Sequence, residues 1–135
     1  MHKDIFVGEK LIAQIYHLDQ ATSSSFPTPE NVTFQFGVGV NKDDKTYKTH
    51  IHKTAKREIE TTSEFLYVVA GVMEIDILDD DAKIIESVTL TSNMGFLQFF
   101  GGHAIRTKAQ TKYFELKQGP YKGRDFDKYD VEDGT

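Results

Sequence analysis

Apolar and polar residues alternate, with a period of two, along most of this 135-residue chain. The alternation is clearest in the stretches 34–41, 72–78 and 113–117. Successive side chains of a β-strand point to opposite faces, so this pattern is typical of strands with one buried and one wet face. Residue types that favour strands are dense, and long runs of the helix-favouring Ala, Leu, Glu and Lys are missing. The pattern therefore predicts an all-β protein.

The alternating stretches predict a series of short strands separated by turns. In chain order, the predicted strands are Ile5–Val7, Leu11–His17, Val32–Val40, Thr46–His52, Arg57–Thr61, Glu64–Ala70, Val72–Leu78, Lys83–Leu90, Phe96–Phe99, His103–Arg106 and Lys112–Lys117. Clusters of Asn, Asp, Ser and Gly predict turns at 41–44, 79–81, 91–93 and 101–102. Many short strands at close spacing are typical of a sandwich, jelly roll or barrel.

The length of the chain predicts one domain over residues 1–135, because domains typically run about 100 to 200 residues. Within it, residues 1–20 supply N-terminal strands, and residues 119–135 form a C-terminal turn and a polar tail. Small jelly rolls leave sheet edges that a second copy can cover. We therefore expect a homodimer, with the N-terminal strands as candidates for its interface.

Composition and charge exclude several classes of function. Cysteine is absent, which excludes disulfides, Cys-ligated zinc, iron–sulfur clusters and thiol catalysis. The net charge is −5, from 16 basic and 21 acidic residues, and the basic residues are scattered, so we expect no nucleic-acid partner. The longest apolar run, Leu66–Met73, is far shorter than the roughly 20 residues of a membrane helix. The first residues lack the apolar run of a secretory signal, which favours a cytoplasmic protein.

Two of the five histidines, His50 and His52, are the first candidates for chemistry. On the predicted strand 46–52 their imidazoles point to one face while Ile51 points to the other. Two adjacent imidazoles can bind a transition metal such as zinc, iron, manganese or nickel. The pair alone is equally compatible with two half-exposed strand residues.

Two further residues strengthen the metal hypothesis. Glu64 opens a predicted strand that runs towards Gly71, and His103 follows the glycine turn 101–102. Three imidazoles and one carboxylate from neighbouring strands would make a mixed nitrogen and oxygen site. In a six-coordinate metal this ligand set leaves two positions open for water or substrate, as catalytic metal sites require.

The combination resembles the cupins, a superfamily of small jelly-roll proteins. Their first motif contains a His-x-His pair and a Glu, matched by His50, His52 and Glu64, and their second brings a His after a glycine turn, matched by His103. The resemblance covers roughly residues 34–116. It implies a cupin jelly roll in which these four residues hold a divalent transition metal. A narrower likeness is to small bacterial cupins found among genes for surface polysaccharides, which points to sugar chemistry.

The identity of the carboxylate ligand is open at this point. Cupins usually leave a short gap between the histidine pair and the Glu, whereas eleven residues separate His52 from Glu64. If the strand of the histidine pair continued, Glu58 or Glu60 would share the face of His52. Glu64 is favoured because its spacing to Gly71 matches the motif.

Two basic residues, Arg57 and Lys117, are further candidates for the site. The planar guanidinium of Arg57 can bind a carboxylate or phosphate through two hydrogen bonds. Lys117 shares a predicted strand face with Glu115, so it either pairs with that carboxylate or faces the substrate. Both residues also fit the description of exposed strand cations.

The sequence supports three hypotheses about function. The first is a metal-dependent cupin enzyme, of isomerase, epimerase or oxygenase type, that acts on a small polar metabolite such as a sugar or sugar derivative. The second is a metal-free isomerase or epimerase of nucleotide-linked sugars, in which a cavity histidine is the acid or base and Arg57 or Lys117 binds the diphosphate. The third is a module that binds a small ligand without turnover. The candidates for catalytic roles are His50, His52, His103, Arg57 and Lys117.

Overall fold

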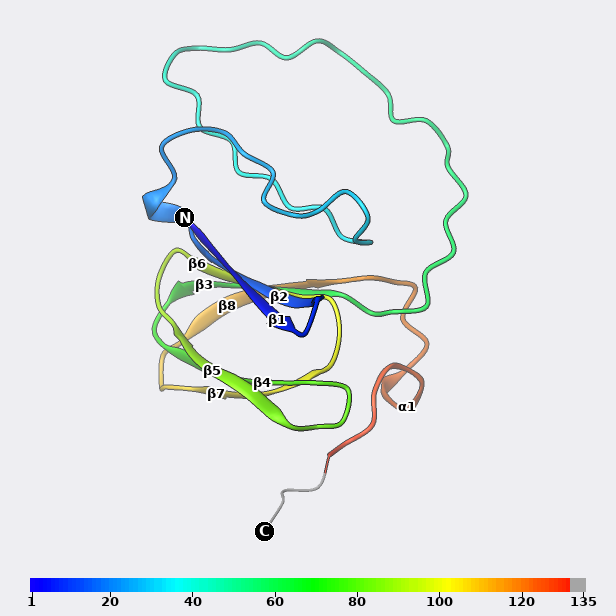
Figure 1. Ribbon diagram of the computed structural model, residues 1–135. Coiled ribbons are helices and arrows are strands. Elements are labelled where there is room, and N and C mark those ends of the chain that lie inside the picture. Colours follow the sequence, from blue (N-terminus) through cyan, green and yellow to red (C-terminus); the bar gives the residue numbers. More distant parts are fainter. Residues whose placement is uncertain (132–135) are drawn as a thin grey trace.

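The structure of the protein is a computed structural model that describes residues 1–131, and its regular secondary structure is almost entirely β-strand (Figure 1). In chain order the strands are β1 (His2–Val7), β2 (Lys10–His17), β3 (Glu64–Ala70), β4 (Met73–Leu78), β5 (Ile84–Leu90), β6 (Met94–Gln98), β7 (Gly102–Thr107) and β8 (Lys112–Lys117). A 3-10 helix, η1 (Leu18–Gln20), follows β2, and a one-turn helix, α1 (Arg124–Asp127), follows β8. Each of these strands overlaps a strand that the alternation predicts, so the all-β prediction is confirmed.

The strands form two antiparallel sheets that face each other as a β-sandwich (Figure 1). One sheet has five strands in the order β1-β2-β6-β3-β8, and the other has three in the order β5-β4-β7. The predicted turn at 79–81 joins β4 to β5, and Oδ1 of Asp79 accepts hydrogen bonds there from the N–H groups of Asp81 and Lys83. The jelly-roll connectivity of a cupin stays a prediction.

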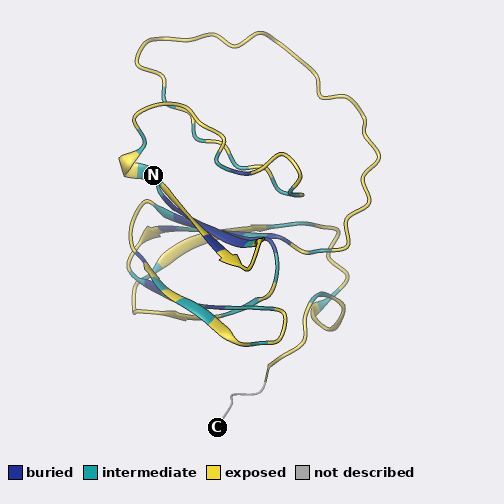
Figure 2. Cartoon of the chain, viewed as in Figure 1, coloured by how far each residue is buried: buried dark blue, intermediate teal, exposed yellow. Residues whose placement is uncertain are grey.

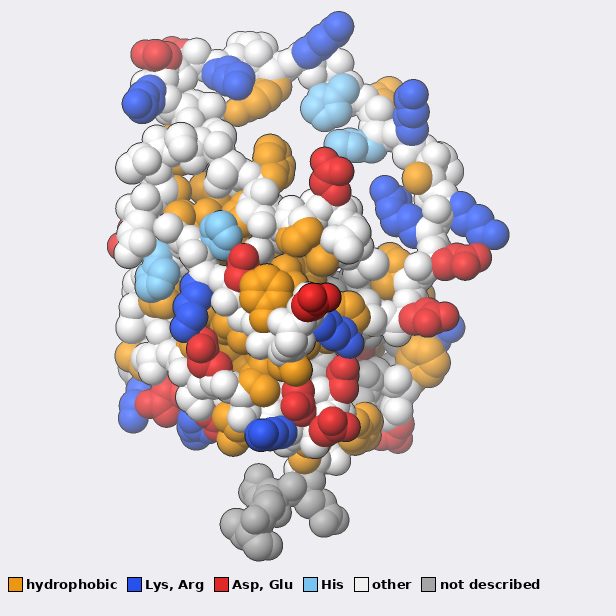
Figure 3. Space-filling model, viewed as in Figure 1, with side chains coloured by type: hydrophobic (Ala, Val, Ile, Leu, Met, Phe, Trp, Pro, Cys, Tyr) orange, Lys and Arg blue, Asp and Glu red, His pale blue; other side chains and the backbone are white. Residues whose placement is uncertain are grey.

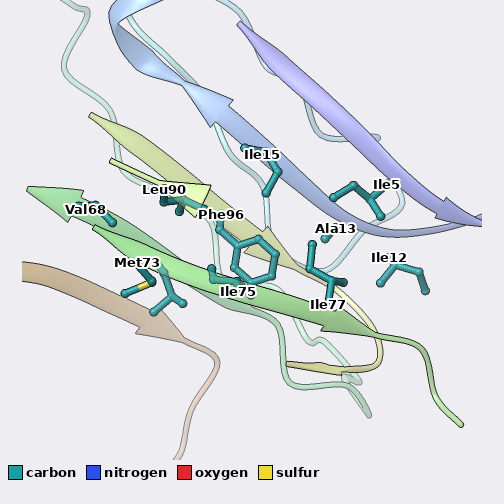
Figure 4. Close-up of a cluster of buried hydrophobic side chains, with 11 residues drawn as sticks. Ile5, Ile12, Ala13, Ile15, Val68, Met73, Ile75, Ile77, Leu90 and Phe96 are labelled. Atoms are coloured by element: carbon teal, nitrogen blue, oxygen red, sulfur yellow. The ribbon is translucent and has the colours of Figure 1, made fainter. Parts of the chain in front are cut away.

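The core lies between the two sheets and follows directly from the alternation (Figure 4). In β4, Met73, Ile75 and Ile77 are buried, while Glu74 and Asp76 between them are partly exposed. Buried side chains from β1, β2, β3, β5 and β6 pack with them. Full burial of one such side chain stabilises the fold by roughly 1.5–3 kcal/mol. This cluster therefore fixes the spacing of the two sheets.

A second apolar cluster covers the outer face of the five-stranded sheet, and its buried members are Tyr16, Phe65, Leu97 and Phe99. Residues 21–40 cross this face, and the ring of Phe36 stacks on that of Tyr16 with centroids 4.0 Å apart. The crossing is anchored where the side-chain amide of Gln14 donates to the carbonyl of Pro27 at 2.9 Å. The outer face is thus packed even though no second sheet lies on it within residues 1–131.

The strands predicted at Val32–Val40, Thr46–His52 and Arg57–Thr61 are wrong. In the described part of the chain, β-pairing between η1 and β3 is limited to an isolated bridge between Ser25 and Val38. Residues 41–62, here called the arm, leave the sandwich as a wide extended loop (Figure 1). Figure 2 shows the arm as almost wholly exposed.

The correction has a physical reason. Alternation describes how a strand divides its side chains, whereas a strand forms only where a neighbouring edge takes up its backbone hydrogen bonds. Residues 45–57 carry five Lys or Arg and no acid, and their mutual repulsion favours a solvated, extended chain. In the stretch 32–40, the side-chain amide of Gln35 donates to the carbonyls of Pro29 and Val32 and curls the chain locally.

The N-terminal residues of the chain form β1 and β2, and the described residues after β8 form a turn and α1. β1 pairs with β2 and stands at an edge of the five-stranded sheet, and the homodimer through these strands stays a prediction. Residues 119–131 form a turn and α1, while residues 132–135 of the predicted tail lie outside the described residues. Within residues 1–131, no helix is both long and apolar enough to cross a membrane.

Candidate active site

A row of polar side chains crosses the inner face of the five-stranded sheet. Glu64, the first residue of β3, lies opposite Gln98 of β6 on one side and opposite Lys117 of β8 on the other. Directly opposed residues of antiparallel strands project from the same face of a sheet. Leu66, two residues after Glu64, enters the core between the sheets from this face. The row therefore looks towards the three-stranded sheet.

His103, near the start of β7, meets this row from the other sheet. Its Nδ1 lies 2.6 Å from Oε1 of Gln98. The amide nitrogen of Gln98 is fully used, because it donates to the carbonyls of Phe100 and Gly102 at 2.9 and 2.7 Å. The oxygen of Gln98 can only accept, so Nδ1 of His103 carries the hydrogen in the neutral imidazole and Nε2 keeps a free lone pair.

Glu64 lies close to that lone pair. Nε2 of His103 is 3.8 Å from Oε2 of Glu64. This separation is longer than a hydrogen bond, so an atom of a substrate can approach both groups. The two side chains are sheltered, with exposed fractions of 25% for His103 and 18% for Glu64. The arrangement therefore places a fixed imidazole next to a partly buried carboxyl group.

Burial shifts the pKa of both groups. Burial raises the pKa of Glu64 above its ordinary value, and the carboxylate of Glu115 adds to the rise. The ammonium groups of Lys117 and Lys128 oppose this rise without cancelling it. Burial lowers the pKa of His103, and the charge of Lys128 lowers it further. The imidazole is therefore neutral at neutral pH, so its contact with Glu64 is not an ion pair.

The pair opens onto a cleft of about 760 Å³. Its lining includes Glu64, Gln98 and His103, together with residues 127–131 from the C-terminal end of the described chain. A smaller hollow of about 440 Å³ lies elsewhere, between the β1–β2 hairpin and residues 27–33. We take the larger cleft as the candidate active site, because it contains Glu64 and His103, two neighbouring groups whose pKa values are shifted by burial.

Lys117 lies at the edge of this site, where it is tied to the C-terminal turn. Its Nζ is 3.3 Å from Oδ2 of Asp127 and 4.0 Å from Oε1 of Glu115. The same Oδ2 of Asp127 lies 3.5 Å from Nζ of Lys128. Asp127 therefore holds the turn against the end of β8 through the ammonium of Lys117.

The structure places the remaining predicted residues away from the cleft. His50, His52 and Arg57 lie on the exposed arm, as do the alternative carboxylates Glu58 and Glu60. The rings of His50 and His52 are neighbours, with centroids 5.1 Å apart. Figure 3 shows Lys, Arg and His side chains along the arm at the top of the view. The sandwich thus brings Glu64, His103 and Lys117 together, and the arm carries the other candidates.

The donor set of this conformation does not fit the four-ligand metal site. Glu64 and His103 supply a carboxylate and an imidazole at the cleft, but His50 and His52 are held on the arm. Among residues 1–131, no group of three or more His, Asp or Glu side chains is arranged to hold a metal ion. The site of zinc, iron, manganese or nickel implied by the resemblance stays a prediction, and no step of the proposed acid–base chemistry passes through a metal.

Sequence reasoning missed two parts of the site. Gln98 is only 4% exposed and stands at the end of a strand whose neighbouring residues are buried and apolar. A polar residue at an inward strand position requires hydrogen-bond partners, and this signal was available in the sequence. Asp127 and Lys128 belong to a polar tail without periodicity, so the pattern contains no sign that they return to the cleft.

Comparisons with known proteins do not identify this chain. Protein-family models, curated proteins and solved structures were each compared with it, and none of the three comparisons found a match. Membership of the cupins therefore stays a prediction from the histidines and the glutamate of the two motifs. The geometry of the cleft is the basis on which a function can be proposed.

Proposed function

We propose that this protein is an acid–base enzyme that isomerises or epimerises a small polar metabolite of the sugar class, with His103 and Glu64 as its catalytic pair. The observation that carries the proposal is the contact geometry of Gln98, His103 and Glu64. It holds one nitrogen as a free base, 3.8 Å from a sheltered carboxyl. Titratable pairs whose surroundings shift their pKa values mark acids and bases in many enzymes.

The proposed chemistry consists of proton transfers alone. Neutral Nε2 of His103 takes a proton from a carbon next to a carbonyl, and the electron pair of the C–H bond becomes that of an enolate. If the imidazolium returns the proton to the former carbonyl carbon, while Glu64 moves the proton of the neighbouring hydroxyl to the former carbonyl oxygen, the substrate is isomerised. Because Nε2 and Oε2 are only 3.8 Å apart, the two groups face one side of the substrate, so epimerisation requires the enolate to turn over before the imidazolium returns the proton to the opposite face of the original carbon. Neither route needs an outside oxidant or reductant.

Gln98 acts through His103 and is a positioning residue. Its amide is locked by the carbonyls of Phe100 and Gly102, so its oxygen fixes both the orientation and the tautomer of the imidazole. The sugar class is supported by the polar lining of the cleft and by the resemblance to small cupins associated with surface polysaccharides. Hydroxyl-rich substrates suit such a lining, because each hydroxyl both donates and accepts hydrogen bonds.

Deuterium exchange tests the proposal before the full reaction is known. Chelator-treated protein is incubated in D2O with neutral sugars, sugar phosphates and nucleotide-linked sugars, and carbon-bound deuterium is measured by NMR and mass spectrometry. We expect exchange next to the carbonyl of at least one substrate. We expect Glu64→Gln and His103→Asn to slow it by about 10²- to 10⁴-fold, the usual contribution of a general acid or base.

Matched variants control for unrelated effects of these substitutions. Glu86→Gln changes an exposed glutamate of β5 that pairs with Lys3, and His17→Gln changes a histidine at the end of β2. Both are expected to exchange at the wild-type rate. Exchange that survives in both site variants contradicts the proposal. Saturable sugar binding without any exchange favours the third hypothesis, a binding module.

The metal-dependent function is the second candidate, and the position of the arm favours it. Thr62, the last residue of the arm, belongs to the lining of the cleft. The eleven residues between His52 and Glu64 span up to about 36 Å when extended, which is long enough for both arm imidazoles to reach the cleft. A bound metal would supply a Lewis acid for the carbonyl.

The same assay separates the two candidates. Exchange that is lost on chelation, restored by zinc, iron, manganese or nickel, and abolished by His50→Ala or His52→Ala supports the metal-dependent function. Exchange that withstands chelation and both substitutions supports the acid–base pair alone. In either case the loss of activity in His103→Asn is expected, so that variant reports on the shared site.

A further inference from the structure

The C-terminal turn, residues 124–131, contributes residues 127–131 as a wall of the cleft, for which the proposed chemistry gives no role. The residues of the turn that line the cleft are Asp127, Lys128, Tyr129, Asp130 and Val131. The turn is docked by Asp127, which meets Lys117 at 3.3 Å. Lys117 is directly opposite Glu64 in the sheet. The wall is therefore fixed to the same row of side chains that carries the catalytic carboxyl.

The side chains of this wall are those that recognise a sugar ring. Tyr129 is 81% exposed although it belongs to the lining of the cleft, so its aromatic ring is free to pack against the C–H face of a pyranose. The ammonium of Lys128 is about half exposed and has hydrogens to donate beyond its contact with Asp127. Oδ1 of Asp130 is paired with Arg124, and its other carboxylate oxygen can accept from hydroxyl groups.

The charge of the cleft disfavours an anionic substrate. Within the described chain its lining contains two cations, Arg106 and Lys128, and six acids: Glu64, Asp76, Asp79, Asp80, Asp127 and Asp130. Arg106 is engaged by Asp76, with Nη1 and Oδ2 2.8 Å apart. A concave surface with an excess of one charge repels ligands of the same sign. The negative charge of the lining would therefore repel a phosphate or diphosphate group.

We propose that residues 127–131 are the sugar-recognition wall of this site, with Lys128 and Tyr129 as specificity-determining residues, and that the substrate is an uncharged, polyhydroxylated sugar. The proposal rests on the proposed function for the identity of the cleft and deepens it by naming the substrate class. It differs from the hypothesis of a nucleotide-linked substrate, in which Arg57 or Lys117 binds a diphosphate. In this structure Arg57 lies on the arm, and Lys117 is paired with Asp127.

Binding measurements test this inference separately from turnover. Saturation-transfer NMR and calorimetry on the full chain use neutral aldoses and ketoses, their 6-phosphates, a uronic acid and a nucleotide-linked hexose. We expect saturable binding of at least one neutral sugar and weaker binding of its phosphorylated form. Tyr129→Ala is expected to weaken neutral-sugar binding about two- to ten-fold, and Lys128→Met by a similar factor of about five.

The chain offers a close control for each substitution. Phe126→Ala removes an aromatic side chain of the same turn that is 71% exposed, and Lys122→Met removes the lysine that lies over its ring. Neither control is expected to change binding. Circular dichroism confirms that each variant has the wild-type fold before its affinity is compared.

Three outcomes overturn the inference. They are the absence of saturable binding by every neutral sugar, tighter binding of a phosphorylated or nucleotide-linked sugar, and wild-type affinity in both Tyr129→Ala and Lys128→Met. The catalytic proposal fails differently. Neutral-sugar binding that depends on Lys128 and Tyr129, but with no deuterium exchange, leaves the recognition wall in place and removes the acid–base function.

Discussion

The sandwich and the arm have similar alternating sequences but different structures. β3 lies between β6 and β8, which take up its backbone hydrogen bonds on both sides, and its Leu66 and Val68 are buried. In the arm, Tyr47 and Ile51 are spaced as they would be on one face of a strand, yet Ile51 is 93% exposed. The sandwich segments have partner edges and mixed charge, whereas the charged residues of 45–57 are all basic. An alternating sequence therefore forms a strand only when a neighbouring strand is present to share its backbone hydrogen bonds.

The same division separates the candidate catalytic residues. Glu64 and Lys117 are opposite each other in one sheet, so register fixes their relative position, and His103, on a paired strand of the other sheet, is fixed near them by its contact with Gln98. His50 and His52 are held by the arm, so the structure gives their distance from each other without giving them a shared site with His103. Preorganised groups on rigid elements are those that support catalysis. This contrast is why the acid–base pair, rather than the four-ligand metal site, carries the proposed function.

Limited proteolysis is expected to give the largest difference between the two regions. A trypsin-like protease should cut after Lys48, Lys53 and Arg57 at least about 10³-fold faster than within the sandwich strands, because cutting there requires unfolding. Mass spectrometry over a time course measures both rates. Comparable rates in the arm and the sandwich would mean that the arm is held as firmly as the core.

Truncation of one isoleucine in each region gives the next largest difference. Ile75→Ala opens a cavity at a position that is 0% exposed, and it should lower the free energy of unfolding by about 2–5 kcal/mol. Ile51→Ala on the arm should change it by less than about 0.5 kcal/mol. Urea denaturation of both variants measures the two values. A large loss in Ile51→Ala would show that the arm packs against another surface in solution.

A smaller effect is expected in the sandwich, where the free energy of unfolding should fall as the pH rises and Glu64 ionises. Burial raises the pKa of Glu64 above its ordinary value of 4.5, so the folded chain binds this proton more tightly than the unfolded chain. Ionising the carboxyl then lowers the free energy of unfolding as the pH rises from 4.5 through the raised pKa. Glu64→Gln cannot ionise and avoids this loss.

Thermal unfolding at acidic and neutral pH checks this expectation. The difference in melting temperature between Glu64→Gln and the wild type should shift in favour of the variant as the pH rises. The exposed control Glu58→Gln, on the arm, should show no such shift, because this side chain is almost fully solvated. A difference that moves towards the wild type with rising pH would mean that Glu64 is stabilised as a carboxylate.

The alternation predicts all the strands of the sandwich, because these depend on local pattern, and the spacing to Gly71 selects Glu64 as the carboxylate. The pairing of β3 with β6 and β8, and the approach of His103 from the other sheet, depend on contacts distant in sequence, which a period of two does not encode. For the same reason, the period of two does not reveal that the arm has no neighbouring strand to pair with. Asp127 and Lys128 return to the cleft where Asp127 meets Lys117, and a polar tail contains no periodic sign of such a contact.

The tautomer of His103 tests the central claim most directly. Two-dimensional ¹⁵N–¹H NMR of the imidazole rings distinguishes a protonated nitrogen from one with a free lone pair. The structure predicts hydrogen on Nδ1 and a free Nε2 at neutral pH, with this preference lost in Gln98→Leu, which removes the accepting oxygen. Hydrogen on Nε2 in the wild-type protein, or a tautomer mixture unchanged in Gln98→Leu, would contradict the proposed catalytic pair.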